Sequence, residues 1–110
     1  MVTIKEFMQI DIRIGRIVEV GPHEKAKKPM YKLKVDLGKE LGVRQIIAGI
    51  AGKYKKEELE GKLIAVVTNL EPKEIAGELS NGMLLAAEDE NETLSLLVPD
   101  KEIKEGSIVH

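Results

Sequence analysis

Alternation of apolar and polar residues in two early stretches constrains the fold more than any other feature of the chain. Every second residue is apolar over much of Ile10–Val20, and charged side chains occupy several of the positions between. Tyr31–Leu37 alternates in the same way and places Lys32 and Lys34 on its polar side. A two-residue period is typical of strands with one buried face. Gly15 interrupts the first stretch, which predicts a bend or bulge there.

The remaining elements follow from shorter signals. A third strand is expected over residues 44–50, after a turn marked by two glycines. The polar segment Lys55–Lys62 predicts a short helix that ends at Gly61. The other expected strands are the apolar runs Leu63–Thr68 and Met83–Ala87, both expected to be buried, and the shorter Leu94–Val98 and Ile108–Val109.

This order of elements predicts an all-β fold. We expect an OB-fold five-stranded barrel with a short helix between strands 3 and 4 and a C-terminal β extension. A single domain is expected over residues 1–110, with the barrel over about 7–87 and the extension over about 88–110. A small barrel of the SH3 type is the alternative that the strand pattern allows.

The composition excludes several classes of protein. The 110 residues include no Cys and only two His, which argues against disulfides, thiol nucleophiles and zinc sites. No apolar run approaches the roughly 20 residues of a membrane helix, and no signal-peptide layout is present, so we expect a cytoplasmic protein. No Gly-rich phosphate-binding motif or activated nucleophile appears. The sequence therefore predicts a protein that is not an enzyme, with no catalytic residue, metal site or cofactor.

Charge is unevenly distributed along the chain. Residues 13–62 carry 13 basic and 7 acidic side chains, a net charge of +6, whereas residues 71–105 carry 3 and 10, a net charge of −7. A basic half within an acidic chain favours local binding of nucleic acid. Clustering of ordinary solubility charge is the alternative interpretation.

The basic half coincides with the usual ligand surface of an OB barrel. Such barrels bind oligonucleotides on the face of strands 2 and 3, between the loops that follow strands 1 and 4. Lys32, Lys34 and Arg44 lie on the expected strands, and residues 22–30 and 69–81 form the expected loops. Aromatic residues number three, too few to stack a series of bases. The expected ligand is therefore a folded RNA, recognised by its shape and phosphates.

Five segments of the chain, in this order, carry a resemblance to a known family: FMQIDIRIGRIVEV, YKLKVDLG, RQIIAGI, YKKEELEGK and NLEPKEIAGELSNGMLLAA. They resemble the stand-alone tRNA-binding domain family from about Phe7 to Val109. The most specific pattern is Asn-x-x-Pro…Gly-x-x-Ser-x-Gly-Met, carried by Asn69, Pro72, Gly77, Ser80, Gly82 and Met83. The family includes the C-terminal appendix or separate β-subunit of methionyl-tRNA synthetases, cytokine-like synthetase cofactors and CsaA-type secretion chaperones. The resemblance implies an OB fold, a homodimer built with the C-terminal extension, and binding to the outer corner of tRNA without chemistry.

Candidate RNA-binding residues follow from the charge pattern and the resemblance together. The set comprises Lys32, Lys34 and Arg44 for phosphates, Asn69, Ser80 and Met83 for the contact surface, and Lys27, Lys28 and Lys73 as secondary candidates. Each has a structural alternative, because strand lysines can be solvated, Asn and Ser can brace turns, and Met can pack in the core.

Two functions are compatible with these residues. The first is a non-catalytic tRNA-binding protein that works in trans to a methionyl-tRNA synthetase, with tRNA, a second copy of the chain and a synthetase as partners. The SNGMLLAA segment resembles the synthetase branch of the family. The alternative is a CsaA-like protein-export chaperone that binds unfolded polypeptides, since the segment from His23 to Met30 resembles that branch.

Overall fold

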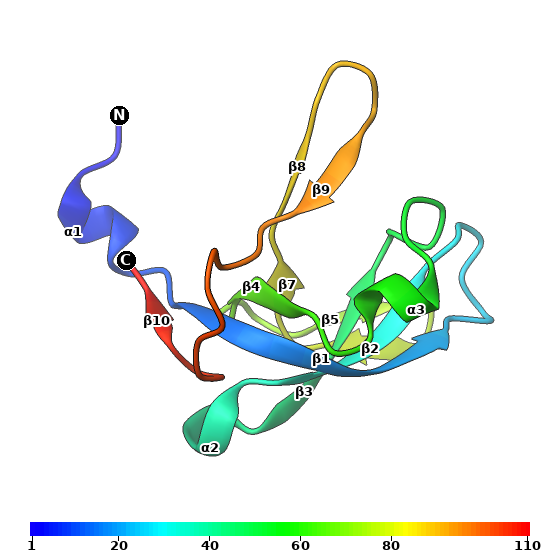
Figure 1. Ribbon diagram of the computed structural model, residues 1–110, viewed down its shortest axis with the longest axis horizontal. Helices are drawn as coiled ribbons and strands as arrows, with labels where there is room; N and C mark the ends of the chain where they lie inside the picture. The colour runs from blue at the N-terminus through cyan, green and yellow to red at the C-terminus, as the bar shows by residue number, and fades with distance from the viewer.

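The first strand organises the whole sheet. In the computed structural model, which describes residues 1–110, β1 (Ile12–Pro22) pairs antiparallel with β2 (Tyr31–Asp36) on one side and β4 (Leu63–Val67) on the other. The strand order is β3-β2-β1-β4-β7, where β3 is Val43–Ala48 and β7 is Met83–Leu84. Contacts between β3 and β7 nearly close this sheet into a barrel (Figure 1). The expected all-β barrel of five strands is confirmed.

Gly15 has a different role from the one expected. The register between β1 and β2 shifts between Ile17 and Glu19, so the bulge lies further along the strand. A Cβ atom at Gly15 would lie 2.6 Å from Cγ1 of Val35 and 2.7 Å from Cδ2 of Leu37. Close packing against β2 and the residue after it therefore requires a glycine at this position.

The core fills the barrel as the alternating pattern predicts. Leu33, Val35 and Leu37 are each no more than 1% exposed, whereas Lys34 and Asp36 between them are half-buried. All five residues of β4 are buried, as its continuous apolar run predicts. Full burial of one such side chain stabilises a fold by about 1.5–3 kcal/mol, so this cluster is the main source of stability.

Three short helices accompany the barrel. Between β3 and β4 lies the expected helix, α3 (Lys56–Leu59), which is shorter than predicted and buries Leu59 completely. The sequence did not predict α1 (Ile4–Phe7), which begins with a capping box between Thr3 and Glu6, or α2 (Gly38–Leu41). No helix has the length and apolar character needed to cross a bilayer.

The prediction of one buried strand over Met83–Ala87 is wrong. The strand that pairs with β4 is β7, which ends at Leu84, and β8 (Ala86–Glu88) instead pairs with β9 (Leu94–Leu96). The switch occurs at Leu85, whose amide donates to Ala65 and whose carbonyl accepts from Leu97. Strands β8 and β9 consequently form an arm that projects from the barrel (Figure 1), and all of β8 is exposed.

A second hairpin lies within the segment expected to be a loop. Strands β5 (Lys73–Ile75) and β6 (Glu78–Ser80) pair across a two-residue turn. Both turn residues have positive φ, 49° at Ala76 and 86° at Gly77, as a type I′ turn requires. Asn-Gly is the usual sequence for this turn, so an alanine in the first position hides the hairpin from sequence analysis.

The C-terminal segment returns to the start of β1. Its last strand, β10 (Ile108–Val109), pairs with β1, and backbone hydrogen bonds join Ile14 to Gly106 and Ser107. Arg16 on β1 forms ion pairs with Glu102 and with Glu105, the latter at 2.7 Å. The extension is thus fastened along the outer side of its own barrel.

Candidate nucleic-acid interface

The strand register decides which side chains share the outer face of β2 and β3. Lys34 lies opposite Gln45, and Lys32 lies opposite Ile47. Residues directly opposite each other in a sheet point to the same side. The outer face therefore carries two lysines beside a glutamine and an isoleucine.

Arg44 does not belong to this face. Its partner across the sheet is Val35, which is fully buried, so the Arg44 side chain starts on the inner side of the barrel wall. Its guanidinium reaches one end of the barrel, where Nη1 donates a hydrogen bond to the carbonyl oxygen of Thr68 at 2.6 Å. The expectation that Arg44 shares a face with the two lysines is wrong, because strand alternation separates them. Its contact with RNA stays a prediction, now placed at a different edge.

A chain of polar contacts crosses the outer face. Nζ of Lys34 donates to Oε1 of Gln45 at 3.1 Å, and Nε2 of Gln45 donates to Oε1 of Glu78 at 3.1 Å. Nζ of Lys32 lies 3.7 Å from the other carboxylate oxygen of Glu78. The hydrogen bond from Gln45 and then the positive charge of Lys32 lower the pKa of Glu78. An acidic side chain from β6 is therefore held ionised against the basic face.

Ser80 fastens the β5–β6 hairpin to the edge of β3. Its hydroxyl accepts a hydrogen bond from the Ile47 amide at 3.0 Å and donates to the carbonyl oxygen of Gly82 at 3.3 Å. The side chain is 6% exposed, and the neighbouring Asn81 amide donates to the carbonyl oxygen of Gln45 at 2.8 Å. These contacts give Ser80 a bracing role, and its contact with RNA stays a prediction.

Asn69 joins the end of β4 to the N-terminal segment. Its Oδ1 accepts from the Asp11 amide at 2.9 Å, and its Nδ2 donates to the carbonyl oxygen of Gln9 at 2.7 Å. The Asp11 carboxylate accepts hydrogen bonds from the Thr68 hydroxyl and from Nε of Arg13, the latter at 3.0 Å. These two hydrogen bonds, with the Thr68 bond the stronger influence, lower the pKa of Asp11. Asn69 thus braces the barrel end, and its contact with RNA also stays a prediction.

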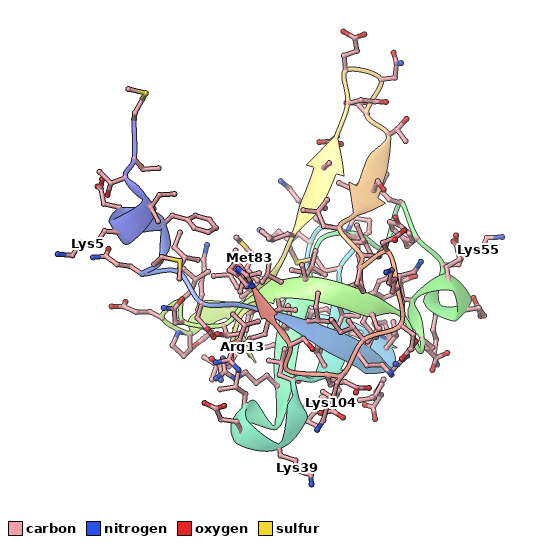
Figure 2. The ribbon with its side chains drawn as sticks, turned by 60° about the vertical axis from the view of Figure 1, so that its left-hand side comes forward. Lys5, Arg13, Lys39, Lys55, Met83 and Lys104 are labelled. Atoms are coloured by element: carbon pink, nitrogen blue, oxygen red, sulfur yellow. The ribbon has the colours of Figure 1, made fainter.

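Met83 borders an apolar hollow beneath the hairpin. The hollow has a volume of about 460 Å³, and its apolar lining consists of Ile47, Leu70, Ile75 and Met83. Lys73 and Glu71 also line it. Met83 is 49% exposed and lies against the body of the barrel, whereas Lys39 on α2 and Lys55, just before α3, point outward (Figure 2). Met83 is the first residue of β7, and its contact with RNA stays a prediction.

The basic loop after β1 is tied to the hairpin by a histidine that the sequence analysis left without a role. His23 is 6% exposed, and its Nε2 lies 2.7 Å from the carbonyl oxygen of Ile75 on β5. A carbonyl oxygen only accepts, so Nε2 carries the proton and donates. Lys27 and Lys28 are exposed in this loop, and Lys73 is exposed on β5. The structure thus brings both flanking loops beside the outer face.

The chemistry of this surface suits binding. No group of three or more His, Asp or Glu side chains is arranged to hold a metal ion. The exposed groups are ammonium ions, amides and apolar side chains, which can neutralise phosphates and cover sugar or base surfaces. Sequence reasoning missed three residues of this site: Gln45, Glu78 and His23. The register of β2 and β3 places Gln45 on the outer face, and contacts with the β5–β6 hairpin bring in Glu78 and His23.

Comparison with known proteins gives consistent matches. The family model described as a putative tRNA binding domain matches residues 12–108. Methionine–tRNA ligase of Pyrococcus horikoshii is 50% identical over 108 residues, which cover 98% of this chain and 14% of the ligase. The chain thus spans about one-seventh of the length of that relative.

Two solved structures share the fold over the full chain. The CsaA chaperone protein from Picrophilus torridus superposes with a TM-score of 0.93 at 39% identity and covers 100% of both chains. The MetRS related protein from Pyrococcus horikoshii gives a TM-score of 0.90 at 34% identity, over 100% of this chain and 98% of that one. Both branches named by the sequence resemblance are therefore represented among its relatives.

Proposed function

The chain belongs to the putative tRNA-binding domain family, and from this premise we propose that it grips folded tRNA without catalysing a reaction itself. It does so in trans to a methionyl-tRNA synthetase, since relatives that share this domain include the methionine–tRNA ligase of Pyrococcus horikoshii. A tRNA ligand implies that the chain works in the cytoplasm.

The observation that carries this proposal is the grouping of cations around one face. Lys32 and Lys34 lie on the outer face of β2 and β3, and the exposed Lys27, Lys28 and Lys73 lie on the two loops that flank it. Phosphate contacts supply most of the affinity of such surfaces and fix the orientation of the nucleic acid.

The aromatic residues support a folded ligand over a single strand. The Tyr31 hydroxyl donates to the Tyr54 carbonyl oxygen at 2.9 Å, and the Tyr54 hydroxyl accepts from the Leu96 amide at 3.1 Å. Both rings pack against the core and leave no stacking platform on the outer face. Recognition then depends on the shape and the phosphates of a folded RNA.

A direct titration tests the proposal. Purified protein is titrated with total tRNA and, separately, with an unfolded polypeptide, and binding is followed by fluorescence anisotropy. Lys73→Met should weaken tRNA binding, whereas Lys55→Met, on the outward-pointing side chain before α3, should not. Equal effects of the two substitutions, or absence of tRNA binding at low salt, would contradict the proposal.

We also propose that two copies of the chain form a homodimer through the C-terminal segment. Leu97, Val98, Ile103 and Ile108 are each at least 44% exposed and border one apolar hollow over β1 and β4. Such a patch suits the matching patch of a second copy. A dimer would present two basic faces to one tRNA and raise its affinity through effective concentration.

A second candidate function rests on the hollow beneath the β5–β6 hairpin. Its apolar lining suits a side chain of an extended polypeptide, and the chain shares its whole fold with the CsaA chaperone protein from Picrophilus torridus. Binding of an unfolded polypeptide but not of tRNA in the titration above would favour this chaperone function.

A further inference from the structure

The side-chain amide of Gln45 and the ammonium of Lys32 converge on a single carboxylate, that of Glu78. We propose that Lys32 and Gln45 form a phosphate-binding subsite, and that Glu78 occupies it until a phosphate of the RNA replaces the carboxylate. This inference rests on the proposed function, because it assigns a ligand group to the same face.

The subsite is built to receive an anion. Lys34 donates to Oε1 of Gln45, which fixes the orientation of the amide and directs its NH2 group away from Lys34. One hydrogen of that NH2 group is donated to the Leu79 carbonyl oxygen at 3.0 Å, and the other to Glu78 at 3.1 Å. A fixed N–H donor beside an ammonium ion is a suitable arrangement for a phosphate oxygen. Lys34 is thus a positioning residue for Gln45.

Glu78 can leave the subsite without opening the hairpin. The hairpin is held to β3 by the Ser80 hydroxyl, the Asn81 amide and the Leu79 carbonyl oxygen, none of which involves the Glu78 side chain. The side chains of Lys32 and Glu78 are 35% and 31% exposed, and their charged atoms are 3.7 Å apart. Ion pairs of this kind contribute little to stability, so exchange of one anion for another is feasible.

A tethered carboxylate gives the subsite selectivity. Because Glu78 is part of the same chain, its effective concentration at the subsite is far higher than that of a free phosphate ion or mononucleotide. A tRNA that also contacts the flanking lysines binds through several phosphates at once and can displace it. Glu78 therefore favours large folded polyanions over small phosphate compounds.

The test compares two substitutions on the same hairpin. Glu78→Gln removes the carboxylate that fills the subsite. Glu74→Gln removes an equal charge from the opposite side of the hairpin, where Glu74 pairs with Leu79 and forms no ion pair with a lysine. We expect Glu78→Gln to tighten tRNA binding by about fivefold, the scale of one partly exposed ion pair, and Glu74→Gln to have a clearly smaller effect.

A second background and a direct probe make the outcome specific. In a Lys32→Met background, Glu78→Gln should no longer tighten binding, and in the wild-type chain tRNA should shift the NMR signals of the Gln45 side-chain amide. Equal effects of the two glutamate substitutions, or an unchanged Gln45 signal at saturation, would overturn the subsite while leaving tRNA binding intact. Absence of tRNA binding by the wild-type chain would instead overturn the proposed function.

Discussion

Nε2 of His23 donates to the carbonyl oxygen of Ile75 across 2.7 Å, and this bond joins the basic loop after β1 to the β5–β6 hairpin. Both partners come from loops that flank the outer face of β2 and β3. The distance between the two groups of flanking lysines is therefore set by a buried side chain and not by the sheet alone.

His23→Ala should destabilise the fold and loosen the loop. The substitution leaves a carbonyl oxygen without its donor, and loss of such a hydrogen bond costs about 1–3 kcal/mol in the free energy of unfolding. Urea denaturation measures the change, and hydrogen exchange of residues 24–30 should quicken. Glu24→Ala, at the exposed neighbouring position, is the control. Equal stabilities of the two variants would show that the contact is unimportant.

Affinity for tRNA should fall steeply with salt. If the lysines around the outer face make roughly three to five phosphate contacts, each releases counterions from the RNA on binding. The logarithm of the association constant plotted against the logarithm of salt concentration should then have a slope of about −2 to −4. Anisotropy titrations at several KCl concentrations measure it. A flat response would show that phosphates are not the main contact.

Arg44→Ala should lower both stability and tRNA affinity. The hydrogen bond from its guanidinium to the carbonyl oxygen of Thr68 contributes about 1–3 kcal/mol to folding, because the donor is charged and the acceptor belongs to a buried residue directly after β4. A further loss of more than about 1 kcal/mol in binding is expected if the guanidinium also reaches a phosphate. Thermal unfolding and tRNA titration of the same variant separate the two effects. Lost stability with unchanged affinity would make Arg44 purely structural.

Strands with a strong local period could be predicted from the sequence, and those without one could not. Leu33 and Val35 alternate with lysines, so both the strand and its faces follow from the residues. In β3, Ile46, Ile47 and Ala48 are all buried, because the β5–β6 hairpin covers part of the outer side. The sequence of β3 therefore has no alternation of apolar and polar residues that would indicate the side on which Arg44 lies.

The site depends still more on tertiary structure. Gln45 and Glu78 lie 33 positions apart in the sequence, and only the attachment of β6 to β3 brings them together. Asn69 and Ser80 were expected to be turn or RNA-contact residues, and the structure adds long-range hydrogen bonds to Asp11 and Ile47 that no local pattern indicates.

The contribution of Asp11 to stability should disappear in acid. Its pKa is lower in the folded chain than the usual 3.8, so the ionised form stabilises the fold above that value. This stability is lost as pH falls through the folded-state pKa, because protonation weakens the acceptor for the Thr68 hydroxyl and removes the negative charge beside Arg13. Asp11→Asn should therefore be less stable than wild type at about pH 6, with the difference shrinking below about pH 4. Urea denaturation across this range measures it, and a constant difference would contradict the assignment.

Disruption of the apolar patch on the C-terminal segment should separate a dimer into monomers. Ile103 is 44% exposed and borders the hollow with Val98 and Ile108, so a second copy that covers the patch would bury it. Ile103→Asp would then place a charge in an apolar interface, which costs several kcal/mol unless the charge is paired. Light scattering of the wild-type chain should give the mass of a dimer, and the variant should give that of a monomer.

The matched control is Val18→Asp, since Val18 is 49% exposed on β1 and does not border that hollow. This variant should remain dimeric, because it adds the same charge without touching the patch. The monomeric Ile103→Asp variant should also bind tRNA more weakly, since one basic face then replaces two. A wild-type chain that stays monomeric at high micromolar concentration would contradict the proposed dimer and the binding of one tRNA by two basic faces. The outer face of a single barrel could still bind RNA in that case.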